Sequence, residues 1–507
     1  MRVPLDRESG QPLYRQIQSF LGEQIRSGTL PPETRLPASR DLAGRLGVSR
    51  MTVTNAYAEL EAEGLIVGRL GAGTFVTKLH APVKSDAWPA PDRDWPLWQQ
   101  RPLGPDWEAA HRGLSELIAP QVHEDEIAFV GGTGAKRLYP AEDFRKAIQG
   151  VLRREGGSAL SYGDPSGYRP LRTTIAHILA SQGVPAHPEN VLITSGAQQA
   201  LALVAYTLLR QGDVVLVESP TYIGALALFR SLGIRLSGIP VDDQGMDVAL
   251  VEDRLKAVRP RLIYLNPTFQ NPTGTCLSGS RRRALIALAD RYDVPIVEDD
   301  IAGDLRYDGR AQPALKALDP GGRVIYVSTF SKVLMPGIRV GFLSAEGPIF
   351  ERLGACKRVQ DLATSNLLQR ALEAYITVGR YQTHLRRACR LYRRRRDAML
   401  DALERHMPEG VRWQPPQGGL FLWLRLPDGL SANQLLPMAR EEAVTFAPGS
   451  RFFPSRPCEG YLRLNFSMNP PLVIGEGIQR LARAIGRLSQ RAKTGPRADV
   501  RQREVGV

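Results

Sequence analysis

The sequence predicts an α/β protein in two parts, in which a small N-terminal helical domain with a β-hairpin precedes a large domain built on a mostly parallel sheet. The first 80 residues show apolar residues at helical spacing, interrupted by tight turns and followed by two short β-rich runs. From about residue 127, short apolar runs alternate with helical stretches, which is typical of parallel strands joined by helices. A chain of 507 residues is long enough for both parts.

Composition excludes several classes of protein. Hydrophobic residues make up 43% and charged residues 23% of the chain, as in ordinary globular proteins. The four cysteines show no CxxC spacing and the seven histidines show no HExxH pattern, so we expect no metal, no disulfide framework and a reducing, cytoplasmic location. No apolar run reaches about 18 residues, so we expect no membrane partner.

The net charge of +14 favours a nucleic-acid partner without establishing one. The first 80 residues hold ten Lys and Arg against eight Asp and Glu, so most of the excess lies further along the chain. Basic runs occur at residues 281–283 and 393–396, and we interpret both as solvated faces of helices. Residues 489–507 are basic and lack periodicity, which predicts a disordered tail.

Three helices are predicted in the first 64 residues. Apolar residues at helical spacing predict the first over residues 11–26. We expect Ser39 to cap a second helix that Gly47 ends, and Ser49 to cap a third over residues 50–63. Two short helices joined by a tight turn form a helix-turn-helix, whose second helix lies in the major groove of DNA. The side chains suited to bases and phosphates at the start of that helix are Ser49, Arg50, Thr52 and Asn55.

A hairpin wing is predicted next, because residues 65–67 and 74–76 are β-rich and flank a glycine-rich tip that carries Arg69. The alternative is a small packed helical domain that binds no DNA, and the wing makes it the weaker one. The stretch from Pro12 to Val76 resembles the winged-helix domain of the GntR family of bacterial regulators. The resemblance implies contacts to double-stranded DNA from Arg40, Ser49, Arg50 and Thr52, and from the wing around Arg69 and Gly71.

Domain boundaries follow from changes in composition. We assign residues 1–78 to the winged helix-turn-helix domain, residues 79–126 to a linker that contains four tryptophans, and residues 127–488 to the large domain. Buried strands are expected at residues 214–217, 262–265, 295–297 and 324–327.

The glycine-rich GGTGAKR at residues 131–137 lacks P-loop spacing, so we do not expect it to bind a nucleotide.

Several residues of the large domain match what pyridoxal 5′-phosphate (PLP) requires of a protein. Lys332 follows the strand at 324–327 between hydroxyl side chains and can form the Schiff base, although a lone lysine is usually a surface charge. Asp299 ends the strand at 295–297 and can pair with the pyridine nitrogen, although it also fits a helix N-cap, a role open to Asp300 as well. The candidates for the phosphate are Ser195, Gly196, Ala197, Thr329, Ser331 and Arg339, with Tyr222 to stack on the ring and Asn271 to bond its hydroxyl.

Segments that include VLITSGAQQAL, NPTFQNPTGT, VEDD and STFSKVLMPGIRVGF resemble the fold-type I aminotransferases, in that family's order, over residues 127–488. The resemblance implies a PLP-dependent transferase fold with large and small domains, Lys332 as the Schiff-base lysine and Asp299 as the pyridine partner. It also implies that Arg463 clamps the carboxylate of a substrate or effector, and that Tyr162 reaches a phosphate across a homodimer interface.

One departure from the family bears on activity. A tyrosine usually follows the aspartate by two or three residues and bonds the ring hydroxyl, whereas this chain has Ile301 and Ala302 there. We interpret the loss as a hint that selection for turnover is relaxed, and we expect weak or no transaminase activity.

The fusion of the two domains resembles the MocR subfamily of GntR regulators. It implies a homodimeric regulator whose second domain senses PLP, with or without a small amino compound, and alters DNA binding. One alternative is an active aminotransferase that carries a DNA-binding domain, which Lys332, Asp299 and Arg463 permit. The other is a DNA-binding protein whose second domain is a cofactor-free dimerisation scaffold.

Overall fold

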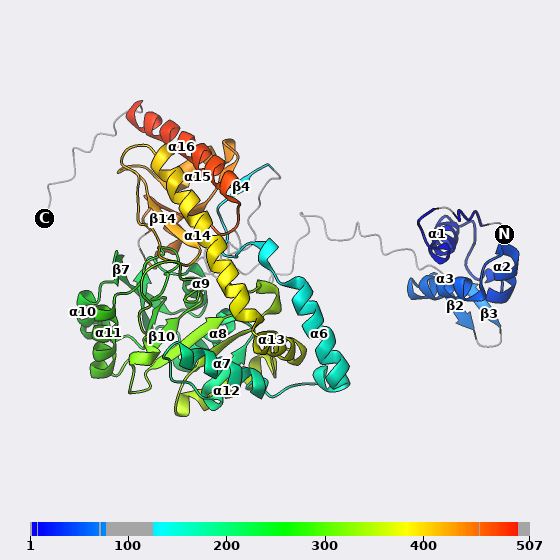
Figure 1. Ribbon diagram of the computed structural model, residues 1–507, viewed down its shortest axis with the longest axis horizontal. Coiled ribbons are helices and arrows are strands. Elements are labelled where there is room, and N and C mark those ends of the chain that lie inside the picture. The colour runs from blue at the N-terminus through cyan, green and yellow to red at the C-terminus, as the bar shows by residue number, and fades with distance from the viewer. Residues whose placement is uncertain (1–2, 8, 70–71, 78–124, 456, 495–507) are drawn as a thin grey trace, which may run out of the picture. The chain divides into compact units, whose positions relative to one another are not determined.

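The computed structural model describes residues 3–7, 9–69, 72–77, 125–455 and 457–494 (Figure 1). The chain divides into two compact units, Met1–Pro102 and Leu103–Val507. The predicted linker lies outside the described residues except for its last two, and the predicted tail lies outside them from residue 495 onward. None of the described helices combines the length and the apolar character that crossing a bilayer requires.

The N-terminal unit packs helices against a small antiparallel sheet. Its helices are α1 (Leu13–Arg26), α2 (Ser39–Leu46) and α3 (Arg50–Ala62). Its strands lie in the order β1 (Arg35–Leu36), β3 (Gly73–Val76) and β2 (Ile66–Arg69). β2 and β3 form the predicted wing. The sequence did not predict β1, because two residues are too few to show a period.

The caps of α2 and α3 are only partly as predicted. The Ser49 hydroxyl accepts a hydrogen bond from the Thr52 N–H at 3.1 Å and caps α3, and Gly47 ends α2 with a φ of 63°. The prediction that Ser39 caps α2 is wrong, because Ala38 holds the N-cap position and Ser39 is the first helical residue. The hydroxyl of Ser39 makes no cap hydrogen bond there.

The large domain is built on an eight-stranded sheet with the order β5-β12-β11-β10-β9-β6-β7-β8. The strands from β11 to β7 run parallel, and β5, β12 and β8 pair antiparallel to their neighbours. All four predicted strands lie in the parallel part. The bounds are β5 (Val191–Thr194), β6 (Val214–Ser219), β7 (Arg235–Asp242), β8 (Gly245–Met246), β9 (Leu262–Leu265), β10 (Ile296–Asp299), β11 (Val324–Thr329) and β12 (Gly341–Ser344).

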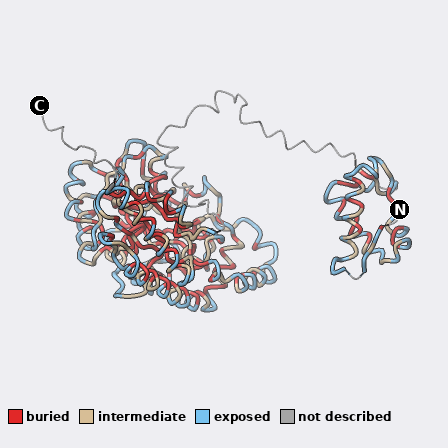
Figure 2. The backbone as a smooth tube through the Cα atoms, turned by 90° about the horizontal axis from the view of Figure 1, so that it is seen from above, coloured by how far each residue is buried: buried red, intermediate tan, exposed pale blue. Residues whose placement is uncertain are grey.

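Helices surround this sheet, and the buried residues are concentrated in the interior of the large unit, where they form several hydrophobic clusters (Figure 2). The helices are α6 (Ala141–Glu155), α7 (Arg169–Ser181), α8 (Ala197–Leu208), α9 (Ile223–Ser231), α10 (Ala249–Val258), α11 (Gly279–Tyr292), α12 (Pro348–Asp361) and α13 (Asn366–Thr377). Short 3-10 turns are η2 (Lys136–Leu138), η3 (Gly156–Ala159), η4 (Pro188–Asn190), η5 (Lys316–Leu318), η6 (Pro336–Ile338) and η7 (Gly449–Phe452).

The small domain holds a second sheet, with strands in the order β13 (Arg412–Trp413), β14 (Phe421–Arg425), β17 (Tyr461–Asn465) and β16 (Ala447–Pro448). Its helices are α15 (Ala432–Glu441) and α16 (Pro471–Thr494), and β15 (Val444–Thr445) pairs with β4 (Ile127–Ala128). The long helix α14 (Arg380–His406), yellow in Figure 1, joins this layer to the large sheet and packs against α16. α16 continues six residues past the expected domain end at 488.

The interpretation of the two basic runs as solvated faces is wrong for three arginines. Arg282 is fully buried, and its guanidinium donates to the carbonyls of Leu277 and Pro267 at 2.9 and 2.8 Å. Arg395 and Arg396 are buried where α14 meets the small domain. Backbone carbonyls that helices and sheets leave unpaired need donors, and a guanidinium offers five.

We predict that Ser49→Ala lowers the free energy of unfolding of the N-terminal domain by about 1 kcal/mol, because the Thr52 N–H loses its acceptor. Denaturant unfolding followed by circular dichroism measures the change. Ser39→Ala is the matched control, since its hydroxyl caps nothing and its loss is expected to cost little. Equal effects of the two substitutions would contradict the assignment of the cap.

Candidate cofactor site and nucleic-acid interface

The candidate cofactor site lies at the carboxyl ends of the parallel strands. β9, β10 and β11 are neighbours that run in one direction, so the loops that follow them meet at one edge of the sheet. Asn271 lies in the loop after β9, Asp299 ends β10, and Lys332 follows β11. The structure therefore brings together three residues that the sequence predicted.

Asp299 is buried, and its two carboxylate oxygens differ. Oδ2 accepts a hydrogen bond from the Tyr264 hydroxyl at 2.7 Å, while Oδ1 has no partner among the described residues. Burial raises the pKa of Asp299 to about 7, an effect that the positive charge of Lys332 opposes. A buried carboxylate oxygen without a donor fits a ligand that brings a proton of its own, as a protonated pyridine ring does.

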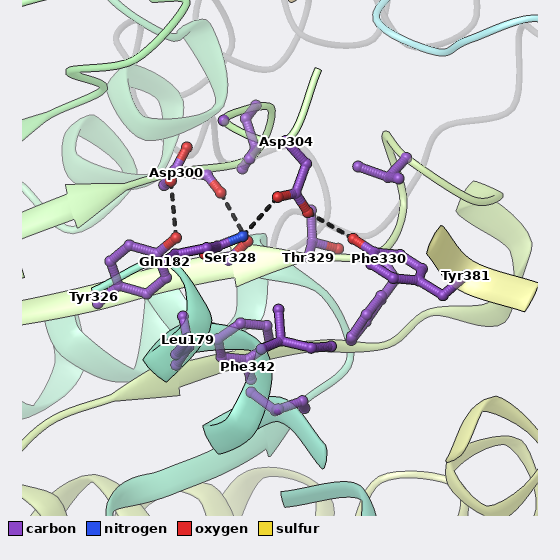
Figure 3. A pocket seen from close by; sticks show the side chains of 15 residues that line it. Leu179, Gln182, Asp300, Asp304, Tyr326, Ser328, Thr329, Phe330, Phe342 and Tyr381 are labelled. Carbon is purple, nitrogen blue, oxygen red and sulfur yellow. Dashed lines mark hydrogen bonds between the residues drawn. The ribbon is translucent and has the colours of Figure 1, made fainter. Parts of the chain in front are cut away.

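Hydrogen bonds to Asp300 and Asp304 fix the turn that follows Asp299. Figure 3 shows a small pocket of about 30 Å³ between α7 and the ends of β10 and β11. Asp300 accepts from the Tyr326 hydroxyl at 2.8 Å, and Asp304 accepts from Tyr381 and Gln182, each at 2.6 Å. These bonds hold both ends of the segment that contains Ile301 and Ala302, which are buried and apolar.

Lys332 contacts the glycine-rich segment that sequence reasoning set aside. Its Nζ donates to the Gly132 carbonyl at 2.7 Å. Burial lowers the pKa of Lys332 to about 8, and the nearby charge of Arg463 adds to the effect. Its neutral amine, the nucleophile in Schiff-base formation, therefore becomes abundant as the pH rises through about 8. GGTGAKR is thus a wall of this site, and the signal that could have found it is its place directly after β4.

Arg463, on β17, reaches the same site from the small domain. Its Nη1 donates to Asn271 Oδ1 and its Nη2 to the Gly131 carbonyl, both at 2.8 Å, while its buried Nε has no partner among the described residues. Its guanidinium carbon lies 4.1 Å from the ring centre of Phe421. Burial lowers the pKa of Arg463 to about 9. Asn271 was predicted to face the ring hydroxyl, and its side-chain oxygen is already bound to Arg463.

The predicted phosphate site is assembled by strand register. Gly341 of β12 pairs with both Thr194 of β5 and Thr329 of β11, so the segments that flank these residues are adjacent. Gly196 adopts a φ of 100°, and Arg339 Nη2 donates to the Ser195 carbonyl at 2.7 Å. Thr329 Oγ1 donates to Ser331 Oγ at 3.0 Å. α8 begins directly after Gly196, and the N–H groups of its first turn have no acceptors within the helix. Such N–H groups favour the binding of an anion.

One N–H group predicted to bind the phosphate already donates a hydrogen bond within the protein. The Ser195 N–H donates to Gln199 Oε1 at 2.7 Å, so it is not open to an anion as predicted. Gln199 Nε2 donates to Asp361 at 2.9 Å, and the fully buried Lys357 donates to the other oxygen of Asp361 at 2.7 Å. This chain of three side chains, the Lys357 relay, fixes the turn from α8 and α12. Sequence reasoning missed it because only the i, i+4 pair on α12 is visible in the sequence.

Two predicted site tyrosines have different surroundings. Tyr222 precedes α9, its hydroxyl donates to Gln198 Oε1 at 3.4 Å, and burial raises the pKa of Tyr222 to about 12, so the phenol stays protonated. Tyr162 follows η3 and is 85% exposed. Within one chain Tyr162 is not brought to the site, so its predicted role across a subunit interface stays a prediction.

The predicted DNA-contacting residues lie on the surface of the N-terminal unit. Arg40, Arg50 and Asn55 are exposed, and Thr52 is half-buried beside the Ser49 cap. Arg69 is not a free charge, because it pairs with Glu33 at 2.8 Å and its guanidinium carbon lies 4.8 Å from the ring centre of Phe75. Gly71 lies outside the described residues. The exposed start of α3 is thus the best-supported part of the predicted interface.

Two known families match the two units. The family described as "Bacterial regulatory proteins, gntR family" matches residues 13–76, and "Aminotransferase class I and II" matches residues 132–481. The solved structure of Pyrococcus horikoshii kynurenine aminotransferase with PMP is 38% identical in sequence, with a TM-score of 0.71 over 74% of this chain and 94% of that one. The large unit therefore has the fold-type I PLP-dependent transferase fold, and PLP is its cofactor.

Two transcription regulators match this chain over nearly its whole length. The probable rhizopine catabolism regulatory protein MocR of Rhizobium meliloti is 33% identical over 482 residues, which cover 95% of each chain. The HTH-type transcriptional regulator TauR of Rhodobacter capsulatus is 34% identical over 482 residues, 93% of this chain and 96% of that protein. Each alignment therefore spans both the DNA-binding unit and the PLP-dependent unit of this chain. The chain belongs to the MocR subfamily of the GntR family of PLP-dependent, DNA-binding transcription regulators.

Proposed function

We propose that Lys332 holds PLP covalently, that Asp299 pairs with its pyridine nitrogen, and that occupancy of this site changes the affinity of the winged helix for its operator. The observation that carries the proposal is the unpartnered Oδ1 of buried Asp299 at the same strand edge as Lys332. PLP supplies an aldehyde for the lysine and an electron-withdrawing ring. We assign its phosphate to Gly196, Ala197, Thr329, Ser331 and Arg339, and its ring face to Tyr222.

We propose a carboxylate-bearing amino compound as the second effector. Arg463 is buried, and its Nε has no partner among the described residues. Its two other nitrogens are held by a backbone carbonyl and by Asn271, so the fork is oriented before any ligand arrives. A planar, oriented guanidinium suits a carboxylate, which accepts two parallel hydrogen bonds.

The side chains after Asp299 favour sensing over turnover. Ile301 and Ala302 are buried and apolar, so neither can donate a hydrogen bond to a ring hydroxyl. The loss of such a donor removes one control over the protonation of the cofactor, whereas the contacts proposed for Asp299, Lys332 and the phosphate turn do not depend on it. An aminotransferase with normal turnover is the second candidate, supported by the relatives that share the large unit.

A homodimer completes the proposed site. Leu160, Tyr162 and Leu362 are large side chains that are 68%, 85% and 60% exposed. Leu160 and Tyr162 line one surface groove together with residues 363–367, next to Leu362. An exposed apolar cluster of this kind is typical of an interface. In a dimer with this face buried, we assign Tyr162 to the phosphate of the partner's site, and the paired winged helices to two operator half-sites in the cytoplasm.

The test compares wild-type protein with Lys332→Ala, with and without PLP. We predict that PLP gives wild-type protein an absorption band beyond 400 nm or so, as a protonated Schiff base of PLP does, and that Lys332→Ala lacks this band. We further predict that PLP shifts the affinity of wild-type protein for its own promoter DNA by about 5-fold or more, within the usual range of allosteric coupling, and leaves Lys332→Ala unchanged.

Three outcomes separate the alternatives. A band with no change in DNA affinity would contradict the sensing proposal. No band in wild-type protein would contradict the roles of Lys332 and Asp299 and favour the cofactor-free scaffold. Transamination of an amino acid at about 1 per second or faster would favour the enzyme.

The Lys357 relay leads to a separate prediction. Lys357→Met is expected to weaken PLP binding by about tenfold, because outer partners that orient a binding group often contribute that much. Fluorescence titration with PLP measures the change. The unfolding temperature without PLP is expected to fall, because the Asp361 carboxylate loses its cationic partner, so the titration is done well below that temperature.

Lys256→Met is the matched control for the relay. Lys256 forms an i, i+4 pair with Glu252 at 3.2 Å on α10, and its side chain is 58% exposed. This substitution is expected to leave PLP affinity unchanged. Wild-type PLP affinity in Lys357→Met would show that the relay does not position the phosphate turn.

A further inference from the structure

The first half of α14 is unusually basic. Residues 380–396 contain eight arginines and no aspartate or glutamate. Burial divides these arginines into two groups. Arg395 and Arg396 point into the protein, where they hydrogen-bond to backbone carbonyls of the small domain and its connecting loop. Arg386, Arg387, Arg390 and Arg394 are exposed.

Four of the five exposed arginines, Arg386, Arg387, Arg390 and Arg394, form the α14 arginine stripe, and the fifth is Arg393. The four residues of the stripe recur at spacings of three and four residues, so they lie on one side of the helix over about 12 Å of its length. Their neighbours Arg380 and Arg393 pair with Asp143 and Asp308 at 3.6 and 3.0 Å. No acidic side chain among the described residues forms an ion pair with the stripe itself.

A second basic segment contacts the buried face of α14, opposite the stripe. The N–H of Ala135 donates to the Tyr392 hydroxyl at 3.1 Å, and Tyr392 is a buried residue that lies about half a turn around α14 from Arg390. Lys136 and Arg137 follow Ala135 directly and are exposed. Burial lowers the pKa of Arg395, which is also on that buried face, to about 10, and the charge of Arg137 adds to the effect. Lys136 and Arg137 therefore do not extend the stripe.

The charges of the stripe are not explained by the folding of the chain. Like charges four residues apart destabilise a helix by about 0.2–0.5 kcal/mol per pair, and Arg386, Arg390 and Arg394 make two such pairs. The first 80 residues carry ten Lys and Arg against eight Asp and Glu, so the net charge of +14 arises almost entirely outside the winged helix. A polyanion is the partner that this distribution fits, and the chain already contains a unit that binds one.

We propose that the α14 arginine stripe is a second DNA-binding surface that contacts the phosphate backbone of a duplex without reading its sequence. Guanidinium groups bind phosphates through paired hydrogen bonds, and exposed unpaired ones lose no ion pair within the chain when they do so. The winged helix then selects the site, and the aminotransferase-like domain adds affinity that depends on salt. The inference rests on the DNA-binding function of the regulator.

The test uses full-length protein and a mixed-sequence DNA duplex of about 60 base pairs, with affinity measured across a series of salt concentrations. The stripe variant is Arg386→Gln, Arg387→Gln, Arg390→Gln and Arg394→Gln together, because glutamine keeps the helix propensity and removes the charge. We expect affinity at low salt to fall at least about tenfold and the slope of log K against log salt to shrink by about 3.6, since each of the four lost phosphate contacts removes about 0.9.

A matched variant removes the same charge elsewhere in the domain. Arg254→Gln, Arg283→Gln, Arg352→Gln and Arg358→Gln replace four exposed arginines on α10, α11 and α12. The proposal predicts an affinity and a salt slope close to those of the wild type for this variant. Equal losses in the two variants would mean that only net charge matters and would overturn the proposal.

Two further measurements distinguish the stripe proposal from a failure of the winged-helix contact and from binding to a membrane. Arg50→Ala tests the winged helix, and if it alone weakens binding while the stripe variant matches wild type, the stripe is a solvated helix face and the proposal is overturned. Weaker binding by the stripe variant with an unaffected Arg50→Ala would support the stripe and count against the winged-helix contact. If the stripe variant keeps DNA affinity but loses binding to phosphatidylglycerol vesicles, the surface serves a membrane and the proposal is overturned.

Discussion

The buried carboxylate of Asp299 is the constraint on which the candidate site depends. A carboxylate at the end of a central strand is costly unless each oxygen has a donor, and only Oδ2 has one. Hydrogen bonds hold this residue and its surroundings in place. The Tyr264 hydroxyl donates to Asp299, and the turn that follows it is fixed by hydrogen bonds to Asp300 and Asp304. The remaining oxygen, Oδ1, gains a hydrogen-bond donor only when a bound ligand supplies one. We therefore regard the bond from the pyridine nitrogen to Asp299 as the main determinant of cofactor binding.

The other site residues are fixed by contacts that do not themselves need the cofactor. Lys332 is held by Gly132, Arg463 by Gly131 and Asn271, and the phosphate turn by Arg339 and the Lys357 relay. Such preorganisation favours tight binding. The apolar Ile301 and Ala302 remove a hydroxyl that the chemistry of turnover would use, and this combination suits a domain that binds a cofactor in order to report its presence.

Much of this fold could be predicted from the sequence because its signals are local. Apolar runs marked the central strands, glycine and serine marked the ends of α2 and α3, and the motif around Lys332 lies within one strand–turn segment. The predictions failed where the deciding contact is distant in sequence. The burial of Arg282 depends on carbonyls of another loop, and the role of Gly131 and Gly132 depends on Arg463 and Lys332, hundreds of residues away. The Lys357 relay joins two helices, and no spacing in the sequence reveals such a contact.

The most direct test of the account is the affinity for PLP of Asp299→Asn beside Asp300→Asn. Both substitutions replace a carboxylate at adjacent positions, and in each carboxylate Oδ1 has no partner among the described residues. Only the Oδ1 of Asp299 is assigned to the cofactor, while Asp300 is bound by Tyr326 on the pocket side. The account predicts that Asp299→Asn weakens PLP binding about ten- to a hundredfold, the range expected for a charged hydrogen bond, and that Asp300→Asn has little effect. Equal affinities for the two variants and the wild type would contradict it.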